Sequence, residues 1–106
     1  ALLELERYDE AIKCYDKLIE LNPKNTGYWC GKIILLEKLG RYEEAIECCD
    51  KATEINPNKA TVWISEKGLA LYLIGKKYEG LKCINKALEI DPNYDDAKLY
   101  KWLIEH

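Results

Sequence analysis

The stretch from Thr26 to Lys59, TGYWCGKIILLEKLGRYEEAIECCDKATEINPNK, decides the fold because its landmarks recur along the chain at a fixed spacing. Three dipeptides mark a period of 34 and then 35 residues: Asn22-Pro23, Asn56-Pro57 and Asp91-Pro92. Small residues and thiols keep the same period: Ala11, Ala45 and Gly80, and Cys14, Cys48 and Cys83. A period of this length is typical of stacked repeat architectures.

One residue interrupts this regularity. Trp29 and Trp63 are 34 residues apart, whereas Gly40 and Gly75 are 35 apart, so the extra residue lies between Trp63 and Gly75. It predicts either a π-bulge in the helix that follows Trp63 or a changed helix start.

Each period contains two amphipathic helices that end at a glycine or a proline. Apolar residues recur at helical spacing in four stretches: Tyr28 to Leu39, Tyr42 to Ile55, Val62 to Ile74 and Tyr78 to Ile90. Gly40 and Gly75 follow the first and third stretches as left-handed caps, and Pro57 and Pro92 stop the second and fourth. Helices this short are marginal alone. The sequence therefore predicts an all-α chain in which antiparallel helix pairs stack on one another.

Length and charge exclude several classes of protein. The chain has 106 residues, with 16 basic and 19 acidic side chains and a net charge of −3, which suits one domain. The longest uncharged apolar run, Gly68 to Gly75, is too short to span a membrane, and the opening Ala1-Leu2-Leu3 has no basic leader typical of a signal peptide. We therefore expect no membrane and no nucleic-acid partner, since the charge balance is mildly acidic.

The five cysteines do not have the spacing of a metal site. There is no Cys-x-x-Cys, and the single histidine, His106, is the last residue. We expect no metal and no cofactor, and free thiols in a reducing cytoplasm. A ratio of 14 lysines to two arginines with no glutamine favours a thermophilic source.

No arrangement of residues predicts catalysis. The adjacent acids Glu43-Glu44 and Asp95-Asp96 point about 100° apart on a helix, so neither pair converges on a substrate. The sequence contains no nucleophile placed with a base and no phosphate-binding glycine loop. We expect that the protein is not an enzyme.

The repeat resembles the tetratricopeptide repeat family. The resemblance rests on Trp29, the Gly40-Arg41-Tyr42-Glu43-Glu44-Ala45 connection and the Asn56-Pro57-Asn58 end. It implies a right-handed superhelical solenoid covering residues 1–106: a partial repeat 1–25, full repeats 26–59 and 60–94, and a terminal helix 95–106. Residues 1 to 5 would then end a first helix. Ile33 departs from the pattern, because Gly68 stands at its place in the next copy.

The resemblance also implies a non-enzymatic scaffold that binds a partner protein or peptide with apolar anchors in a concave groove. The groove residues would come from the first helices: Cys30, Gly31, Ile34, Glu37, Lys38, Ser65, Glu66, Leu69, Tyr72, Leu73, Leu99 and Tyr100. The same surface would also include Gly27, Val62, Asp96 and Leu103. Members that grip acidic chaperone tails use a basic clamp, which these positions lack.

Two alternatives stay open. Leu69, Tyr72 and Leu73 could serve inter-helix packing rather than a ligand. The apolar half-repeats at both ends could instead drive self-assembly, with the helix from Asp95 to His106 docking on the Leu2 to Leu21 end of another molecule and giving an oligomer.

Overall fold

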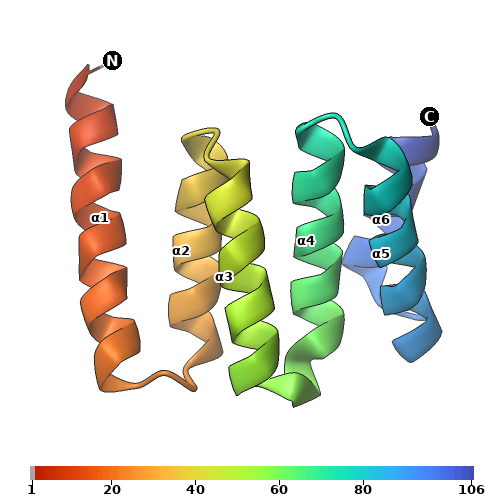
Figure 1. Ribbon diagram of the computed structural model, residues 1–106, viewed down its shortest axis with the longest axis horizontal. Helices are drawn as coiled ribbons and strands as arrows, with labels where there is room; N and C mark the ends of the chain where they lie inside the picture. The colour runs from red at the N-terminus through yellow and green to blue at the C-terminus, as the bar shows by residue number, and fades with distance from the viewer. Residues whose placement is uncertain (1) are drawn as a thin grey trace.

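The computed structural model describes residues 2–106, with side chains from residue 6 onward, and within them it contains helices and no strand. The helices are α1 (Leu2–Leu21), α2 (Thr26–Lys38), α3 (Tyr42–Ile55), the 3-10 turn η1 (Pro57–Lys59), α4 (Ala60–Leu73), α5 (Lys77–Ile90) and α6 (Asp95–Glu105). Successive helices run antiparallel; α1 to α4 follow one another across the view in chain order, and α5 lies next to α4 with α6 behind it (Figure 1). The predicted all-α solenoid of helix pairs is confirmed.

Glycines terminate α2 and α4 as predicted. Gly40 and Gly75 have φ values of 75° and 93°, in the region that side chains with a Cβ avoid. At α2, the Gly40 amide donates to Glu37 O at 3.0 Å and the Arg41 amide donates to Leu36 O at 2.8 Å. The same pair of bonds follows Gly75. Both turns are therefore Schellman motifs, which satisfy the last carbonyls of the helix.

The first helix corrects a prediction. Residues 1 to 5 were expected to end a separate helix, but α1 runs without a break from Leu2 to Leu21. Glu6 occupies the place that Gly40 and Gly75 hold in the other copies. A glutamate in the left-handed conformation costs about 1–2 kcal/mol, so the chain continues as helix where the glycine is missing.

The extra residue is accommodated by helix length. α4 has 14 residues and α2 has 13, and both are α-helical throughout, so there is no π-bulge. Both helices also begin three residues before their tryptophan, at Thr26 and Ala60. Neither predicted alternative is correct, because the insertion lengthens α4 at the end that follows Trp63.

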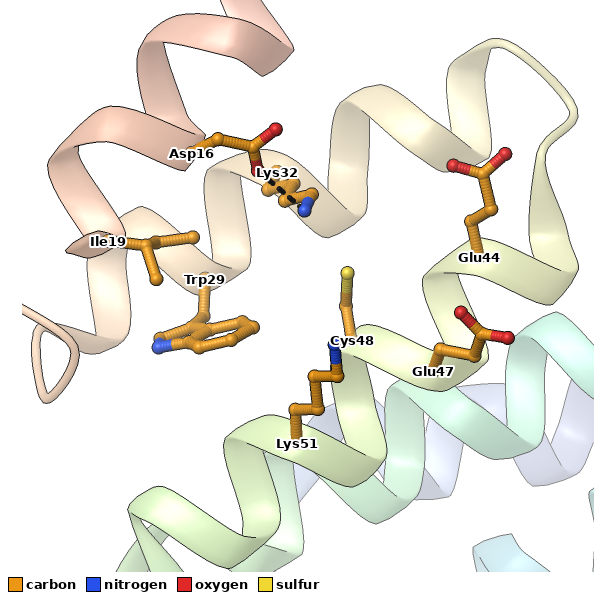
Figure 2. Close-up of a pocket in the computed structure, with 8 residues that line it drawn as sticks. All are labelled: Asp16, Ile19, Trp29, Lys32, Glu44, Glu47, Cys48 and Lys51. Carbon is orange, nitrogen blue, oxygen red and sulfur yellow. Dashed lines mark ion pairs between the residues drawn. The ribbon is translucent and has the colours of Figure 1, made fainter.

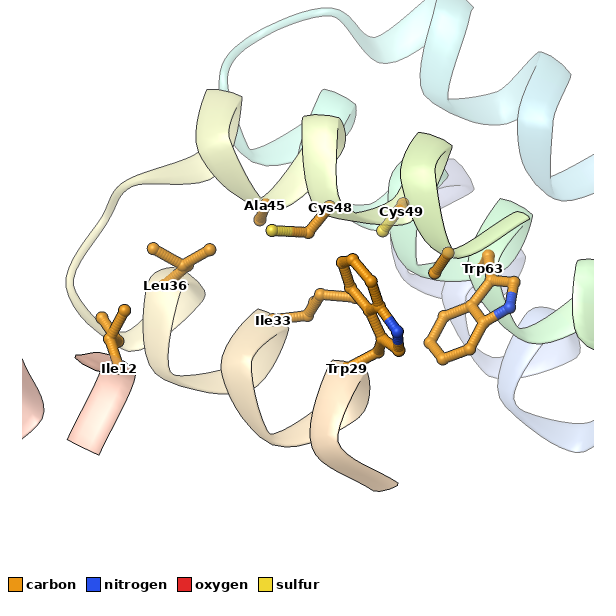
Figure 3. Close-up of a cluster of buried hydrophobic side chains, with 9 residues drawn as sticks. Ile12, Trp29, Ile33, Leu36, Ala45, Cys48, Cys49 and Trp63 are labelled. Atoms are coloured by element: carbon orange, nitrogen blue, oxygen red, sulfur yellow. The ribbon is translucent and has the colours of Figure 1, made fainter. Parts of the chain in front are cut away.

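The core lies between the helix pairs. One cluster of buried side chains joins α1, α2, α3 and α4 and contains Trp29, Ile33, Leu36 and Trp63, with Ala45, Cys48, Cys49, Ala52 and Ile12 (Figure 3). A second cluster joins α5 and α6: Ile84, Ala87, Ala97 and Ile104. Trp29 and Trp63 are core residues, and their burial links successive repeats.

Helices α4 and α5 approach each other through two glycines. A Cβ placed on Gly80 would lie 2.6 Å from the Gly68 carbonyl oxygen, and one on Gly68 would lie 2.8 Å from the Gly80 oxygen. These distances are shorter than van der Waals contact, so the backbones touch. The equivalent positions of the α2–α3 pair hold Ile33 and Ala45, both buried.

Candidate functional site

The first helices of successive repeats, α2, α4 and α6, share a face that carries exposed aliphatic side chains. Ile34 on α2 is 50% exposed, Leu73 on α4 is 45% exposed and Leu99 on α6 is 53% exposed. All three were predicted groove residues. Exposure of large aliphatic side chains from three neighbouring helices is typical of a surface that binds a partner.

A hollow of about 290 Å³, here called the groove pocket, lies on this face. Its lining comes from α2, α4 and the start of α6: Cys30, Ile33, Ile34, Val62, Trp63, Glu66, Tyr94 and Asp96. The sequence predicted Cys30, Ile34, Val62, Glu66 and Asp96 on this concave surface. It missed Tyr94, whose only signal is its position directly before α6.

A hydrogen bond joins two predicted groove residues across the face. The Tyr100 hydroxyl donates to Glu66 Oε1 at 2.8 Å, connecting α6 to α4. Burial and the neighbouring Glu66 carboxylate raise the pKa of the Tyr100 hydroxyl. Tyr100 therefore remains a hydrogen-bond donor at physiological pH and fixes one oxygen of Glu66.

Glu37 lies next to Glu66, and the two carboxyl groups repel each other when both are ionised. Its Oε1 atom is buried and receives no hydrogen bond from the side chains that the structure describes. Burial and the Glu66 carboxylate raise the pKa of Glu37 to about 8. At neutral pH much of Glu37 is therefore protonated, since two adjacent carboxylates in a partly desolvated site resist joint ionisation.

Three predicted groove residues pack against neighbouring residues inside the fold. Gly31 lies under the ring of Tyr15 on α1, where a Cβ would come within 2.6 Å of the Tyr15 hydroxyl oxygen. Ser65 is fully buried, and its hydroxyl donates to Thr61 O at 2.7 Å. Tyr72 packs against the second core cluster. These three residues serve packing, because their side chains or backbone are already in contact with neighbouring helices.

The remaining predicted groove residues differ in exposure. Lys38 is exposed near the end of α2, and Leu69 and Cys30 are half-buried on α4 and α2. Burial, followed by the Glu66 carboxylate, raises the pKa of the Cys30 thiol. Cys30 is therefore an uncharged part of the pocket wall.

A second hollow, of about 260 Å³, lies between α1, α2 and α3 (Figure 2). Its lining mixes both charge signs: Asp16, Lys32, Glu44, Glu47 and Lys51, with Ile19, Trp29 and Cys48. The Lys32 ammonium pairs with Asp16 at 2.6 Å. Burial raises the pKa of the Cys48 thiol, so this cysteine is not an activated nucleophile. The sequence did not predict this hollow.

The recurring cysteines do not share one environment. Cys48 is buried, Cys83 is half-buried and Cys14 is exposed, although the period places them at one position of the repeat. In the described part of the chain no three histidine, cysteine or acidic side chains gather to hold a metal ion. None of its helices is long and apolar enough to cross a membrane.

Solved structures of similar shape cover nearly the whole chain. The first tetratricopeptide domain of Spaghetti (RPAP3), bound to an HSP90 peptide, is 27% identical over 97% of this chain and 81% of its own, with a TM-score of 0.77. The first such domain of human RPAP3 is 27% identical over 97% and 80%, with a TM-score of 0.79. The tetratricopeptide domain of Arabidopsis OM64 is 23% identical over 93% and 81%, with a TM-score of 0.75.

Sequence comparisons give the same assignment. Two models described as "Tetratricopeptide repeat" match the chain, one over residues 1–25 and 28–59 and the other over residues 65–94. Comparison with curated protein sequences gives no match. The repeats of this family and the neighbouring structures are non-enzymatic scaffolds for protein interaction. The chain belongs to the tetratricopeptide repeat family.

Proposed function

We propose that this protein binds an extended peptide or a helix of a partner protein in the groove formed by α2, α4 and α6. The observation that carries this function is the groove pocket, which is open to the surface and walled by Ile34 and Val62. An open apolar pocket between helices suits an aliphatic anchor from a peptide. The HSP90 peptide bound to the similar Spaghetti domain supports a peptide as the class of ligand.

Under this proposal, the ligand contacts those predicted groove residues that are not engaged in packing inside the fold. They are Cys30, Ile34, Glu37, Lys38, Glu66, Leu69, Leu73, Leu99 and Tyr100. Acidic side chains at the pocket rim repel phosphate groups, so a nucleic acid is not the proposed partner. Five free thiols support a cytoplasmic location, since reducing compartments preserve them.

Selection of peptides followed by mapping tests this function. Random dodecapeptides displayed on phage would be selected on the immobilised chain, and the best would be synthesised and titrated into labelled protein. We expect the amide signals of Cys30, Ile34 and Glu66 to shift. Ile34→Asp should weaken binding at least tenfold. Leu21→Asp is the matched control, because Leu21 is 83% exposed at the end of α1 and should leave affinity unchanged. Shifts confined to α3 and α5 would contradict the proposal.

Self-association through α6 is a second candidate function. Trp102 is 57% exposed and Leu103 is 42% exposed, and both lie on this last helix beside Leu99. A second copy could cover these side chains in a heterologous contact. Light scattering at about 1 mM should then give a mass above that of a monomer, and Trp102→Glu should restore the monomer. A monomer at that concentration excludes this candidate.

A further inference from the structure

The polar residues of the groove pocket are acidic. Glu66 and Asp96 contribute carboxylates to its lining, and none of the eight described residues that line it is a lysine or an arginine. Glu37 lies next to Glu66, but it is largely protonated at neutral pH and adds no full negative charge. The Tyr94 hydroxyl donates to Asp96 Oδ2 at 3.3 Å, which positions that carboxylate without neutralising it.

Several acidic side chains elsewhere in the molecule have basic partners. Asp16 pairs with Lys32 at 2.6 Å, Asp50 pairs with Lys67 at 2.9 Å, and Arg41 pairs with Glu44 at 2.6 Å. In the groove pocket, Asp96 accepts a hydrogen bond from the Tyr94 hydroxyl and Glu66 accepts one from the Tyr100 hydroxyl, and both donors are uncharged. The Glu66 and Asp96 carboxylates are therefore hydrogen-bonded by neutral tyrosine hydroxyls, and no basic residue lines the pocket beside them.

The size of the pocket limits what can fill it. About 290 Å³ lies at the small end of ligand sites, which suits one or two side chains rather than a large cofactor. Ile34 and Val62 form an apolar wall of the groove pocket, and Glu66 lines the same pocket. A long side chain with an apolar stem and a cationic end matches both parts, because lysine and arginine bury their stems while the charged group reaches polar atoms.

Building on the proposed groove function, we propose that the partner is a peptide segment in which a lysine or arginine lies beside an aliphatic residue. The aliphatic side chain packs on Ile34 and Val62, and the cationic group binds the Glu66 carboxylate, whose Oε1 is held by Tyr100. Asp96 lies on the same pocket and adds to the negative potential. Charge-assisted hydrogen bonds of this kind are about twice as strong as neutral ones.

Three synthetic hexapeptides test this inference with the full chain. Each has a central leucine followed by one variable residue in an acetylated alanine–serine background, and the variable residue is lysine, glutamine or glutamate. Amide shifts of Cys30, Ile34 and Glu66 in labelled protein would be followed at low salt. We expect the lysine peptide to bind about tenfold more tightly than the glutamate peptide, a difference of about 1.4 kcal/mol, because the Glu66 carboxylate attracts the lysine ammonium and repels the glutamate carboxylate.

Matched variants distinguish binding of lysine to the Glu66 carboxylate from a general attraction to the acidic protein. Glu66→Gln should remove most of the preference for lysine over glutamate, whereas Glu89→Gln removes an exposed acid of α5 outside the pocket and should preserve it. Added salt should reduce the preference, because it screens exposed charges. Circular dichroism of both variants checks that the helices remain.

The outcomes distinguish this inference from the function on which it rests. Equal binding of the three peptides at Cys30 and Ile34, or tighter binding of the glutamate peptide, overturns the basic partner and keeps the groove. Preference for lysine that survives Glu66→Gln also overturns it. If no peptide shifts any groove residue, both proposals fail.

Discussion

The two complete helix pairs, α2–α3 and α4–α5, have the same turn chemistry but different packing. Both first helices end in a Schellman motif at a glycine with positive φ. Within the pairs, however, α2 and α3 face each other with Ile33 and Ala45, whereas α4 and α5 meet through Gly68 and Gly80 with direct backbone contact. Both repeats thus have the glycine that ends the first helix. The distance between the two helices of a pair differs, because it depends on the size of the residues where the helices meet.

The tryptophans differ between the pairs in a second way. The Trp29 indole donates from Nε1 to Pro23 O at 2.7 Å, which ties α2 to the loop before it. Trp63, fully buried at the matching position, has an Nε1 atom without an acceptor among the described residues. The η1 turn before α4 replaces the loop that supplies the acceptor in the first pair.

Gly80→Ala should produce the largest loss of stability, because the new Cβ would meet the Gly68 carbonyl oxygen at 2.6 Å. Overpacking of this kind costs about 1–3 kcal/mol, and displacing rigid backbone lies at the upper end. We expect a net loss of about 2 kcal/mol in the free energy of unfolding by urea, even though alanine favours helix by about 1 kcal/mol.

Ala45→Gly is the matched change in the α2–α3 pair. It should cost about 1 kcal/mol, mainly through helix propensity. If Gly80→Ala instead stabilised the protein, the backbone contact between α4 and α5 would not limit their spacing, and the contrast between the pairs would be lost.

Replacing each tryptophan by phenylalanine should show the next largest difference. Trp29→Phe removes the hydrogen bond to Pro23 O, whereas Trp63→Phe removes a buried donor that has no described acceptor. The first variant should therefore lose about 1 kcal/mol more than the second, measured by urea unfolding. Equal losses of stability would mean that the hydrogen bond of Trp29 Nε1 does not distinguish the stability of the two helix pairs.

The acid pair between the repeats should make stability depend on pH. Glu37 has a folded pKa of about 8, above its ordinary value of 4.5, so folding favours its protonated form. This contribution is complete below about pH 4.5 and is lost as pH rises through about 8. Glu37→Gln keeps a neutral side chain there, so its stability relative to the native chain should rise with pH across that window.

Urea unfolding at pH 5, 6.5 and 8.5 measures this difference. Glu66→Gln serves as a cross-check, because removing the neighbouring carboxylate should also flatten the dependence. A difference between native and Glu37→Gln proteins that stays constant from pH 5 to 8.5 would count against the coupling of the two carboxyl groups.

The ion pairs at the repeat junctions should have the smallest effect. Asp16–Lys32 and Asp50–Lys67 occupy equivalent positions, and the next period carries Asn85 and Lys101 there. Asp50→Asn should cost about 0.5 kcal/mol, and most of the loss should vanish in 1 M NaCl because the Asp50 carboxylate is exposed. Asn85→Asp should gain a similar amount. A loss that persists in high salt would indicate packing rather than charge.

Much of the architecture could be predicted from the sequence because local chemistry controls it. The glycine at position 40 and the proline at position 57 end their helices without help from distant residues, and the period of the landmarks predicted the stacking. The wrong helix boundary in α1 also has a local cause, since Glu6 stands where a helix-ending glycine would be needed. The absence of a glycine at position 6 is the local signal of the long α1.

The candidate site was less predictable. The period predicted that Ile34 and Glu66 lie on the first-helix face, but it could not show that Gly31 lies under Tyr15 or that Ser65 is buried against Thr61. Those contacts depend on how one helix is rotated against its neighbours. The inserted residue in α4 changes that rotation by about 100° between the two ends of the helix.

The sequence by itself therefore determined the helices, their order and the repeat that stacks them, because caps and hydrophobic periodicity act over a few residues. Only the tertiary structure decided which first-helix side chains reach a common pocket and which carboxylates become neighbours. The contact of Tyr100 with Glu66 and the raised pKa of Glu37 arise from helices far apart in the chain. Such contacts depend on distances across the stack, which a period in the sequence does not encode.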